Sequence, residues 1–287
     1  MILVTGSTGT VGRELLAELR DRNVGAAALV HSRDKAEVVG RLGAEARIGD
    51  FDDHDTLRAA VRNIDRLFLL TPATPRQVAW ETDLLAIASE AGIERIVRLS
   101  VINADPRAPE FIYSSHGRCE QALAESGIAH TILRCNDFMQ NFLLSAETIS
   151  SKGRVYGTGV GRAAVGMVDV RDIAAVAAET LSEDGHEGRR LVVTGPEAIS
   201  FPAAAQILSS VLRTSVAYEE LPGNDYVAAL VGVGLPEWRA ESLRELYESY
   251  GGGTAAVVTG AVRETTGARP RALKHFARDH TDQLLAR

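Results

Sequence analysis

The stretch Ile2-Leu3-Val4-Thr5-Gly6-Ser7-Thr8-Gly9-Thr10-Val11-Gly12 decides the fold of this chain. A β-branched and aliphatic run is followed by glycines and then by apolar residues at helical spacing, which predicts a strand, a tight turn and a helix. Gly6 allows a sharp turn, Gly9 leaves the backbone open to a pyrophosphate, and Gly12 lets the helix pack close to the strand. The helix N-terminus offers free N–H groups to phosphates. The stretch therefore predicts a dinucleotide site; a tight turn without a ligand is the alternative.

Beyond this turn, short apolar runs alternate with helical patterns, which predicts a parallel sheet covered by helices on both faces. The expected later strands cover residues 26–30, 46–48, 67–70, 95–99, 130–134, 165–168 and 191–194. We therefore predict an α/β fold, with a Rossmann-type doubly wound sheet in residues 1–195. A break at Gly195-Pro196 separates it from a smaller C-terminal substrate lobe, residues 196–287, and residues 138–160 are expected to contribute to the pocket.

Composition narrows the class of protein. The 287 residues carry a net charge of -7 and no block of basic residues, so nucleic acid is not an expected partner. No apolar run approaches the ~20 residues of a membrane span, and the chain starts in a strand without a signal peptide, so we expect a cytoplasmic protein. Cys119 and Cys135 form no CxxC pair, and no metal site is expected.

The residues after the second expected strand bear on the choice of cofactor. An NAD site would place an acid about 20 residues past the glycines, but this chain has His31-Ser32-Arg33 before its first acid, Asp34. Ser32 and Arg33 would bind a ribose 2′-phosphate, which favours NADP(H) over NAD. The alternative is that Arg33 is a solvated arginine in a loop. We also expect a helix from Asp34, with that residue as its cap.

Further candidates follow the other strands, whose carboxyl ends meet at one edge of a parallel sheet. Asp50 and Phe51 follow the third strand, where Asp50 could accept from the adenine amino group or serve only as a turn residue. Polar and aromatic residues mix after the strand at 130–134, which is typical of a pocket wall. The predicted wall residues are Asp137, Phe138, Met139 and Phe142.

Several ordered motifs resemble the NmrA-like branch of the atypical short-chain dehydrogenases/reductases, closest to its bacterial NAD(P)H-quinone oxidoreductase-like members. They lie at residues 4–12, 49–52, 116–120, 131–141, 168–174 and 191–197. The resemblance implies a Rossmann domain with a small C-terminal lobe and NADP(H) as cofactor. It also implies a set of cofactor residues: Thr8, Gly9, Thr10 and Val11 at the pyrophosphate, Arg33 at the 2′-phosphate, Thr71 and Pro72 along the cofactor, Ser100 near the nicotinamide ribose, and Asn136 to Phe138 beside the ring. The family often has its arginine at the position that His31 occupies in this chain.

The usual Tyr–Lys catalytic pair of short-chain dehydrogenases is absent from the sequence. Four residues after Tyr113 stands Gly117, and no lysine occurs between Lys35 and Lys152. The branch commonly has a histidine at the position of His116, which could bind the ribose or relay a proton, or simply pack at a helix start. Tyr113 is a weaker candidate for the acid.

A quinone relaxes the need for an acid, because the anion formed by hydride addition is delocalised and positioning could suffice. The sequence therefore predicts an NADPH-dependent reductase acting on a quinone or another conjugated or aromatic carbonyl. Two alternatives stay open: an NADP(H)-binding sensor or regulator without turnover, and a tailoring reductase of aromatic polyketide metabolism. A homodimer could form through an apolar helix face at residues 75–91.

Overall fold

The glycine turn leaves the first strand of a seven-stranded parallel sheet. The structure, a computed structural model, describes residues 1–287. The strand order is β3-β2-β1-β4-β5-β6-β9, and each neighbouring pair is parallel. The strands are β1 (Ile2–Val4), β2 (Ala26–Val30), β3 (Glu45–Ile48), β4 (Arg66–Leu69), β5 (Arg95–Val101), β6 (Ala129–Cys135) and β9 (Arg190–Val193). This order is that of a doubly wound dinucleotide-binding sheet, and the predicted fold class is confirmed.

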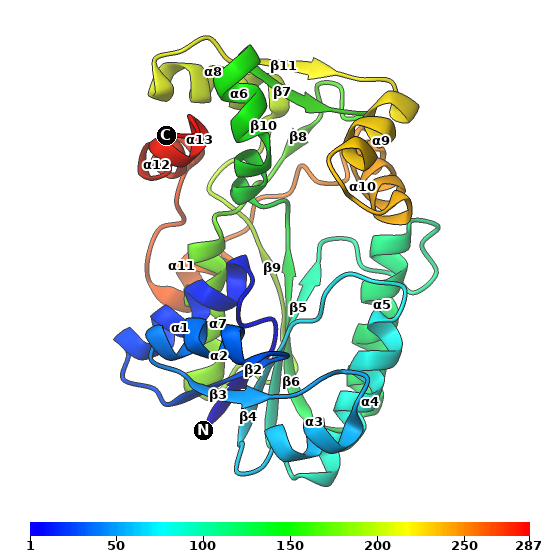
Figure 1. The fold of residues 1–287 in the computed structure, drawn as a ribbon, viewed down its shortest axis with the longest axis vertical. Coiled ribbons are helices and arrows are strands. Elements are labelled where there is room, and N and C mark those ends of the chain that lie inside the picture. Colours follow the sequence, from blue (N-terminus) through cyan, green and yellow to red (C-terminus); the bar gives the residue numbers. More distant parts are fainter.

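Helices cover both faces of this sheet (Figure 1). One face packs against α1 (Thr10–Asp21), α2 (Arg33–Arg41), α7 (Val170–Ser182) and α11 (Ala261–Thr266). The other face packs against α3 (His54–Ala60), α4 (Gln77–Glu90) and α5 (Phe111–Glu125). Helix α1 packs on the sheet because its buried residues recur at helical spacing and form one apolar stripe. They are Val11, Gly12, Leu15, Leu16 and Leu19.

A second hydrophobic core lies beyond the carboxyl edge of the sheet, in the upper part of Figure 1. Two small sheets accompany it, with β7 parallel to β11 and β8 antiparallel to β10. The elements of this region are η1 (Met139–Ser145), α6 (Ala146–Lys152), β7 (Arg154–Gly157), β8 (Ala164–Val165), β10 (Ile199–Ser200), α8 (Phe201–Leu212), β11 (Ala217–Glu220), α9 (Gly223–Gly232), α10 (Glu237–Tyr250), α12 (Leu273–Asp279) and α13 (Thr281–Leu284).

Each of these two cores contains residues from both sides of residue 195. The second core takes Met139, Phe142 and Val165 from before that point. The first core takes Ala261 and Val262 from after it. A division into residues 1–195 and 196–287 stays a prediction, and these two cores each draw on residues of both stretches.

Two local predictions are wrong. Residues 165–168 do not join the central sheet, because β9 occupies the place beside β6, and Val168 makes only an isolated bridge with Phe138. Helix α2 begins at Arg33, and its N-cap is Ser32, whose side chain accepts from the Lys35 N–H at 3.4 Å. Asp34 therefore lies inside the first turn, where a carboxylate still suits the helix dipole.

An extended segment, residues 254–260, runs from the second core back to the sheet; we call it the return segment. The carbonyl oxygen of Ala255 accepts hydrogen bonds from Asn136 Nδ2 at 2.9 Å and from the Gly166 N–H at 3.0 Å. Thr259 Oγ1 donates to the Val192 carbonyl oxygen at 2.5 Å. The segment thus ties both cores to the ends of β6 and β9. No helix of the structure combines the length and apolar character needed to cross a bilayer.

Candidate cofactor and substrate site

The glycine turn has the shape that a dinucleotide site requires. Gly6 has a φ of +61°, and a Cβ atom there would lie 2.8 Å from Leu70 Cγ. A Cβ atom at Gly12 would lie 2.3 Å from the Gly6 carbonyl oxygen, so the turn and helix α1 can approach only with glycine there. Gly9 differs, because it is exposed and a Cβ atom would meet only the Gly6 oxygen, at 3.2 Å. The fold therefore needs Gly6 and Gly12, while Gly9 leaves an open surface before α1.

Helix α1 offers its N-terminus to this open surface. Gly9 is its N-cap, and no side chain accepts a hydrogen bond from the first turn. The free N–H groups and the positive end of the helix dipole therefore stay available for an anion. Thr8 and the exposed Thr10 flank Gly9, whereas the side chain of Val11 is buried in the core. A pyrophosphate would meet backbone N–H groups and the two threonines.

The carboxyl ends of the parallel strands bring the other predicted cofactor residues to this same edge. Among these predicted residues, those after β2 and β3 are exposed or half-buried, β4 is followed by one buried and one exposed residue, and those at the ends of β5 and β6 are buried. The exposed residues are His31, Arg33, Asp50 and Pro72; the half-buried ones are Ser32 and Phe51; the buried ones are Thr71, Ser100 and Asn136. Contact of each with the cofactor stays a prediction.

At the adenine end, part of Asp50 is already used by the turn. Its Oδ1 accepts a hydrogen bond from the Asp52 N–H at 3.0 Å. Phe51 stacks on Trp80 with ring centroids 5.6 Å apart, and Trp80 Nε1 donates to Asp52 at 2.6 Å. The turn after β3 is therefore held against α4, and both interpretations of Asp50 stay open.

A buried ion pair lies between β5 and α4. Arg98 is 0% exposed and Glu81 is 1% exposed. Arg98 Nε donates to Glu81 Oε2 at 2.6 Å, and Glu81 Oε1 also accepts from Thr71 Oγ1 at 2.6 Å and from Gln77 Nε2 at 3.2 Å. Thr71 is therefore fixed by a carboxylate that the sequence did not connect with it.

This ion pair also sets the state of His116. Arg98 Nη2 lies 3.3 Å from His116 Nδ1, and because a guanidinium can only donate, Nδ1 must accept and Nε2 must carry the ring hydrogen. Burial, assisted by the charge of Arg98, lowers the pKa of His116 well below its usual value. Nε2 has no hydrogen-bond partner in the protein and is not fully buried, so it is open to solvent or a ligand. A neutral imidazole with its hydrogen on Nε2 is a hydrogen-bond donor, and the roles of His116 at the ribose, in a proton relay or in packing stay predictions.

Several other predicted site groups are already engaged. Tyr113, 4% exposed, shares a hydrogen bond of 2.9 Å with Ser249 Oγ, so its hydroxyl joins α5 to α10. Ser100 Oγ donates to Glu120 Oε1 at 2.6 Å. Met139 and Phe142 are 2% and 3% exposed within the second core, so they support the predicted pocket wall from behind. Phe138 is half-buried and packs against the first core.

The chain matches the model of the NmrA-like family over residues 1–276. The chain belongs to the NmrA-like family. A curated relative, the NAD(P)H azoreductase of Xenophilus azovorans, is 36% identical over 280 residues, which cover 98% of each chain. Quinone oxidoreductase 2 of Escherichia coli strain K12 is 31% identical, covering 85% of this chain and 86% of the relative. The solved Escherichia coli NADPH-dependent quinone oxidoreductase in complex with NADPH has a TM-score of 0.88 at 27% identity, covering 97% and 99%.

This NmrA-like chain also contains a polar group that sequence reasoning assigned only to the pocket wall. Asp137, directly after Asn136, is 7% exposed, and burial raises its pKa to about 7, with the Asn141 hydrogen bond acting in the opposite direction. Three tyrosines whose pKa values are raised partly by its charge were missed altogether: Tyr226, Tyr247 and Tyr250. Tyr226 lies on α9, and Tyr247 and Tyr250 lie on α10, about 90 to 110 positions after Asp137, so no local sequence pattern connects them with it.

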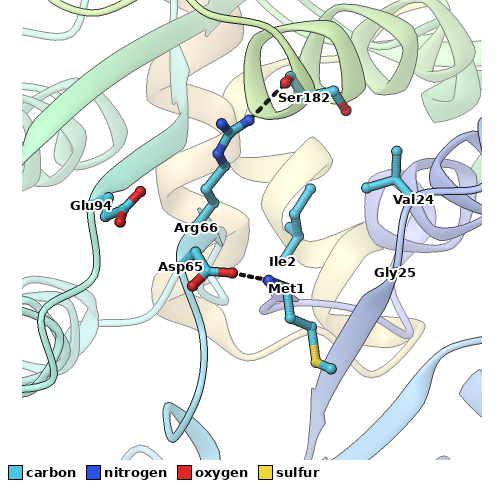
Figure 2. Close-up of a pocket in the computed structure, with 8 residues that line it drawn as sticks. All are labelled: Met1, Ile2, Val24, Gly25, Asp65, Arg66, Glu94 and Ser182. Atoms are coloured by element: carbon cyan, nitrogen blue, oxygen red, sulfur yellow. Dashed lines mark hydrogen bonds and ion pairs between the residues drawn. The ribbon is translucent and has the colours of Figure 1, made fainter.

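One cavity of the NmrA-like chain lies apart from the candidate cofactor site. It has a volume of about 530 Å³ and lies at the amino edge of the sheet, opposite the glycine turn (Figure 2). The Met1 amino group pairs with Asp65 there, and Arg66 Nη1 donates to the Ser182 carbonyl oxygen at 2.7 Å. These charged groups satisfy one another, so we assign the cavity no role in catalysis.

Proposed function

We propose that this chain is an NADPH-dependent reductase that transfers hydride to a quinone or a related conjugated carbonyl. Its family and its relatives make it an NAD(P)H-dependent reductase with NADP(H) as cofactor. The observation that carries the proposal is the glycine turn, which is open only at Gly9 and faces the uncapped N-terminus of α1. The quinone class is the finer part of the proposal and depends on the residues around the expected nicotinamide position.

The chain's own residues would bind and orient the cofactor, which supplies the hydride. Backbone N–H groups of the turn would hold the pyrophosphate, and the exposed Arg33 would pair with the 2′-phosphate. Thr71, held by Glu81, would define the wall along the cofactor. Because β4, β5 and β6 form the second half of the sheet, the nicotinamide is expected over their carboxyl ends.

The site lacks the machinery that ketone reduction normally uses. The residue four positions after Tyr113 is Gly117, where a Cβ atom would lie 2.2 Å from the backbone nitrogen of Pro106. The helix packs there so closely that no lysine side chain fits. A neutral His116 can orient an oxygen by donating from Nε2, and a quinone accepts hydride with the resulting charge delocalised over its ring. These features support an electron-poor acceptor.

The proposal is tested with purified protein, NADPH or NADH and a panel of quinones, following the loss of reduced-nicotinamide absorbance. We expect quinone-dependent oxidation that is faster with NADPH. Replacing Arg33 with alanine should lower kcat/KM for NADPH by about 10- to 100-fold, because a charge-assisted hydrogen bond contributes about 1.5–3 kcal/mol, and should leave NADH turnover unchanged. The matched control is Arg41→Ala, an exposed arginine in the last turn of the same helix.

Two results would contradict this function. Faster turnover with NADH would show that the His31–Arg33 stretch does not select a 2′-phosphate. Tight NADPH binding with no reduced acceptor would favour an NADP(H)-binding regulator, and binding measured by calorimetry separates this case from a protein that has lost its cofactor site.

The role of His116 gives a separate prediction. His116→Phe removes the donor at similar size, and we expect kcat/KM to fall about 10-fold, the value of one lost hydrogen bond near its upper range. The factor should be the same between pH 6 and pH 9, because the imidazole of the native protein is neutral throughout that range. His116→Gln, which keeps an N–H donor, should recover most of the rate. A loss that grows toward low pH would instead indicate an imidazolium acid.

A further inference from the structure

Asp137 is a carboxyl group with one oxygen left unpaired by the protein. It follows β6 directly and is 7% exposed. Its Oδ1 accepts from Asn141 Nδ2 at 2.9 Å, whereas Oδ2 has no protein donor. Because Oδ2 is not fully buried, it is in contact with solvent. A buried carboxyl with a free, accessible oxygen is available to a ligand.

Three phenols of the C-terminal helices lie within electrostatic range of this carboxyl. Tyr226 of α9 and Tyr247 of α10 meet edge to face with ring centroids 6.2 Å apart, and Tyr247 and Tyr250 do so at 5.7 Å. Each has its pKa raised in part by the charge of Asp137, so all three lie within electrostatic reach of it. Their hydroxyl groups make no hydrogen bond with the protein, and none is sealed from solvent. The three phenols therefore keep hydroxyl groups without a protein partner within electrostatic range of Asp137.

We propose that Asp137 is the proton donor of this reductase and protonates the oxygen of the acceptor from Oδ2. The inference rests on the proposed function. Hydride from the cofactor forms a C–H bond at a ring carbon of the conjugated acceptor and pushes an electron pair onto the carbonyl oxygen, while the O–H bond of Asp137 breaks and its proton forms an O–H bond on that oxygen. For a quinone, the ring carbon then loses a proton to solvent and the second oxygen gains one, which gives the aromatic hydroquinone. The carboxylate that remains takes a proton from solvent, so one NADPH and one proton reduce one quinone to the hydroquinone.

The surroundings favour the protonated form of this carboxyl, so that about half of it carries a proton at pH 7. Burial raises the pKa of Asp137 to about 7, and no cation contributes to it. The groups that face it are Asn141 of η1, Tyr226 of α9, and Tyr247 and Tyr250 of α10, and the three phenols stay neutral because their own pKa values are raised. An ordinary carboxyl would be ionised at pH 7 and could not donate.

Its position also suits the role. Asp137 follows the strand beside β5, over whose carboxyl end the nicotinamide is expected, and the phenols lie on the side of the second core. The Asn136 side chain donates to the Ala255 carbonyl oxygen. Asp137, the next residue, carries the acidic group at the end of β6.

The test compares Asp137→Asn with the wild-type protein. Asparagine keeps an acceptor for Asn141 but has no titratable proton. In the wild type, kcat/KM for the quinone should be constant below pH 7 and fall above it; in the variant it should be lower by about 100-fold at pH 6 and independent of pH, so that the two approach each other at pH 9. Asp225→Asn, an exposed acid on α9, is the matched control and should keep the wild-type profile.

Thermal unfolding without cofactor gives a second readout. The pKa of Asp137 is higher in the folded protein than its ordinary value of 3.8, so its stabilising effect is complete below pH 4 and is lost as the pH rises to about 7. Relative to Asp137→Asn, the Tm of the wild type should therefore fall by about 5 °C between pH 4 and pH 8. A Tm difference that does not change with pH would overturn the proposal.

The assignment of Asp137 and the proposed quinone reduction are contradicted by different results. A wild type that oxidises NADPH with quinones while Asp137→Asn keeps the same rate and pH profile contradicts the assignment of Asp137 alone. A wild type that reduces no quinone contradicts the proposed function itself.

Discussion

Replacing Arg98 with methionine is expected to lower the free energy of unfolding by about 3–5 kcal/mol, because the substitution leaves the carboxylate of Glu81 buried without its cation. Arg98 and Glu81 are 0% and 1% exposed, so water cannot take the place of the missing charge. Urea denaturation followed by circular dichroism measures the change. Arg58→Met removes an exposed partner of Asp55 and should cost less than about 1 kcal/mol.

A double variant shows whether the buried charge causes this loss. In Arg98→Met with Glu81→Gln, the amide oxygen of glutamine can still accept from Thr71 and Gln77, and no unpaired charge remains. We expect the double variant to recover most of the lost stability. Equal stability of the single and double variants would contradict this explanation.

Gly9→Ala is expected to weaken NADPH binding by about 5- to 150-fold while leaving the protein folded. The added methyl group points into the open surface before α1, and overpacking a close contact costs about 1–3 kcal/mol. Gly9 has a φ of -77°, which alanine adopts freely, so the unfolding free energy of the protein without cofactor should change by less than about 1 kcal/mol. Calorimetric titration with NADPH gives the affinity.

The neighbouring glycines serve as the contrast. Gly12→Ala places a methyl group 2.3 Å from the Gly6 carbonyl oxygen and should destabilise the protein even without cofactor. If Gly9→Ala binds NADPH with the affinity of the wild type, the pyrophosphate does not lie at this turn.

The parallel sheet was predictable because its strands are continuous apolar runs separated by helices, a pattern that depends on local sequence. The predicted bounds of the strand at 26–30 are those of the structure. The run at 165–168 was misplaced because an apolar pattern shows that a strand is buried but not which strand it pairs with. The sequence predicted a smaller C-terminal lobe, but it did not show which residues pack together in the second core, since they come from segments far apart in the chain.

The protonation states of the site residues could not be predicted from the sequence, because they depend on burial and on charged residues of other helices and strands. Arg98 looked like an ordinary strand residue, and its partner Glu81 lies on the preceding helix. Without that pair the neutral state of His116 could not be inferred. The pKa of Asp137 likewise follows from burial beneath the second core, and no pattern around residue 137 reports it.

The return segment has a consequence for how this protein is made. Helix α11, which follows the segment, supplies Ala261 and Val262 to the core that begins with Ile2 and Val4. During synthesis the nucleotide-binding sheet therefore emerges with part of one face uncovered, and it stays so until nearly the whole chain has left the ribosome. A nascent chain halted before residue 261 should keep apolar surface exposed and be held by chaperones, whereas one that includes α11 should be released from them.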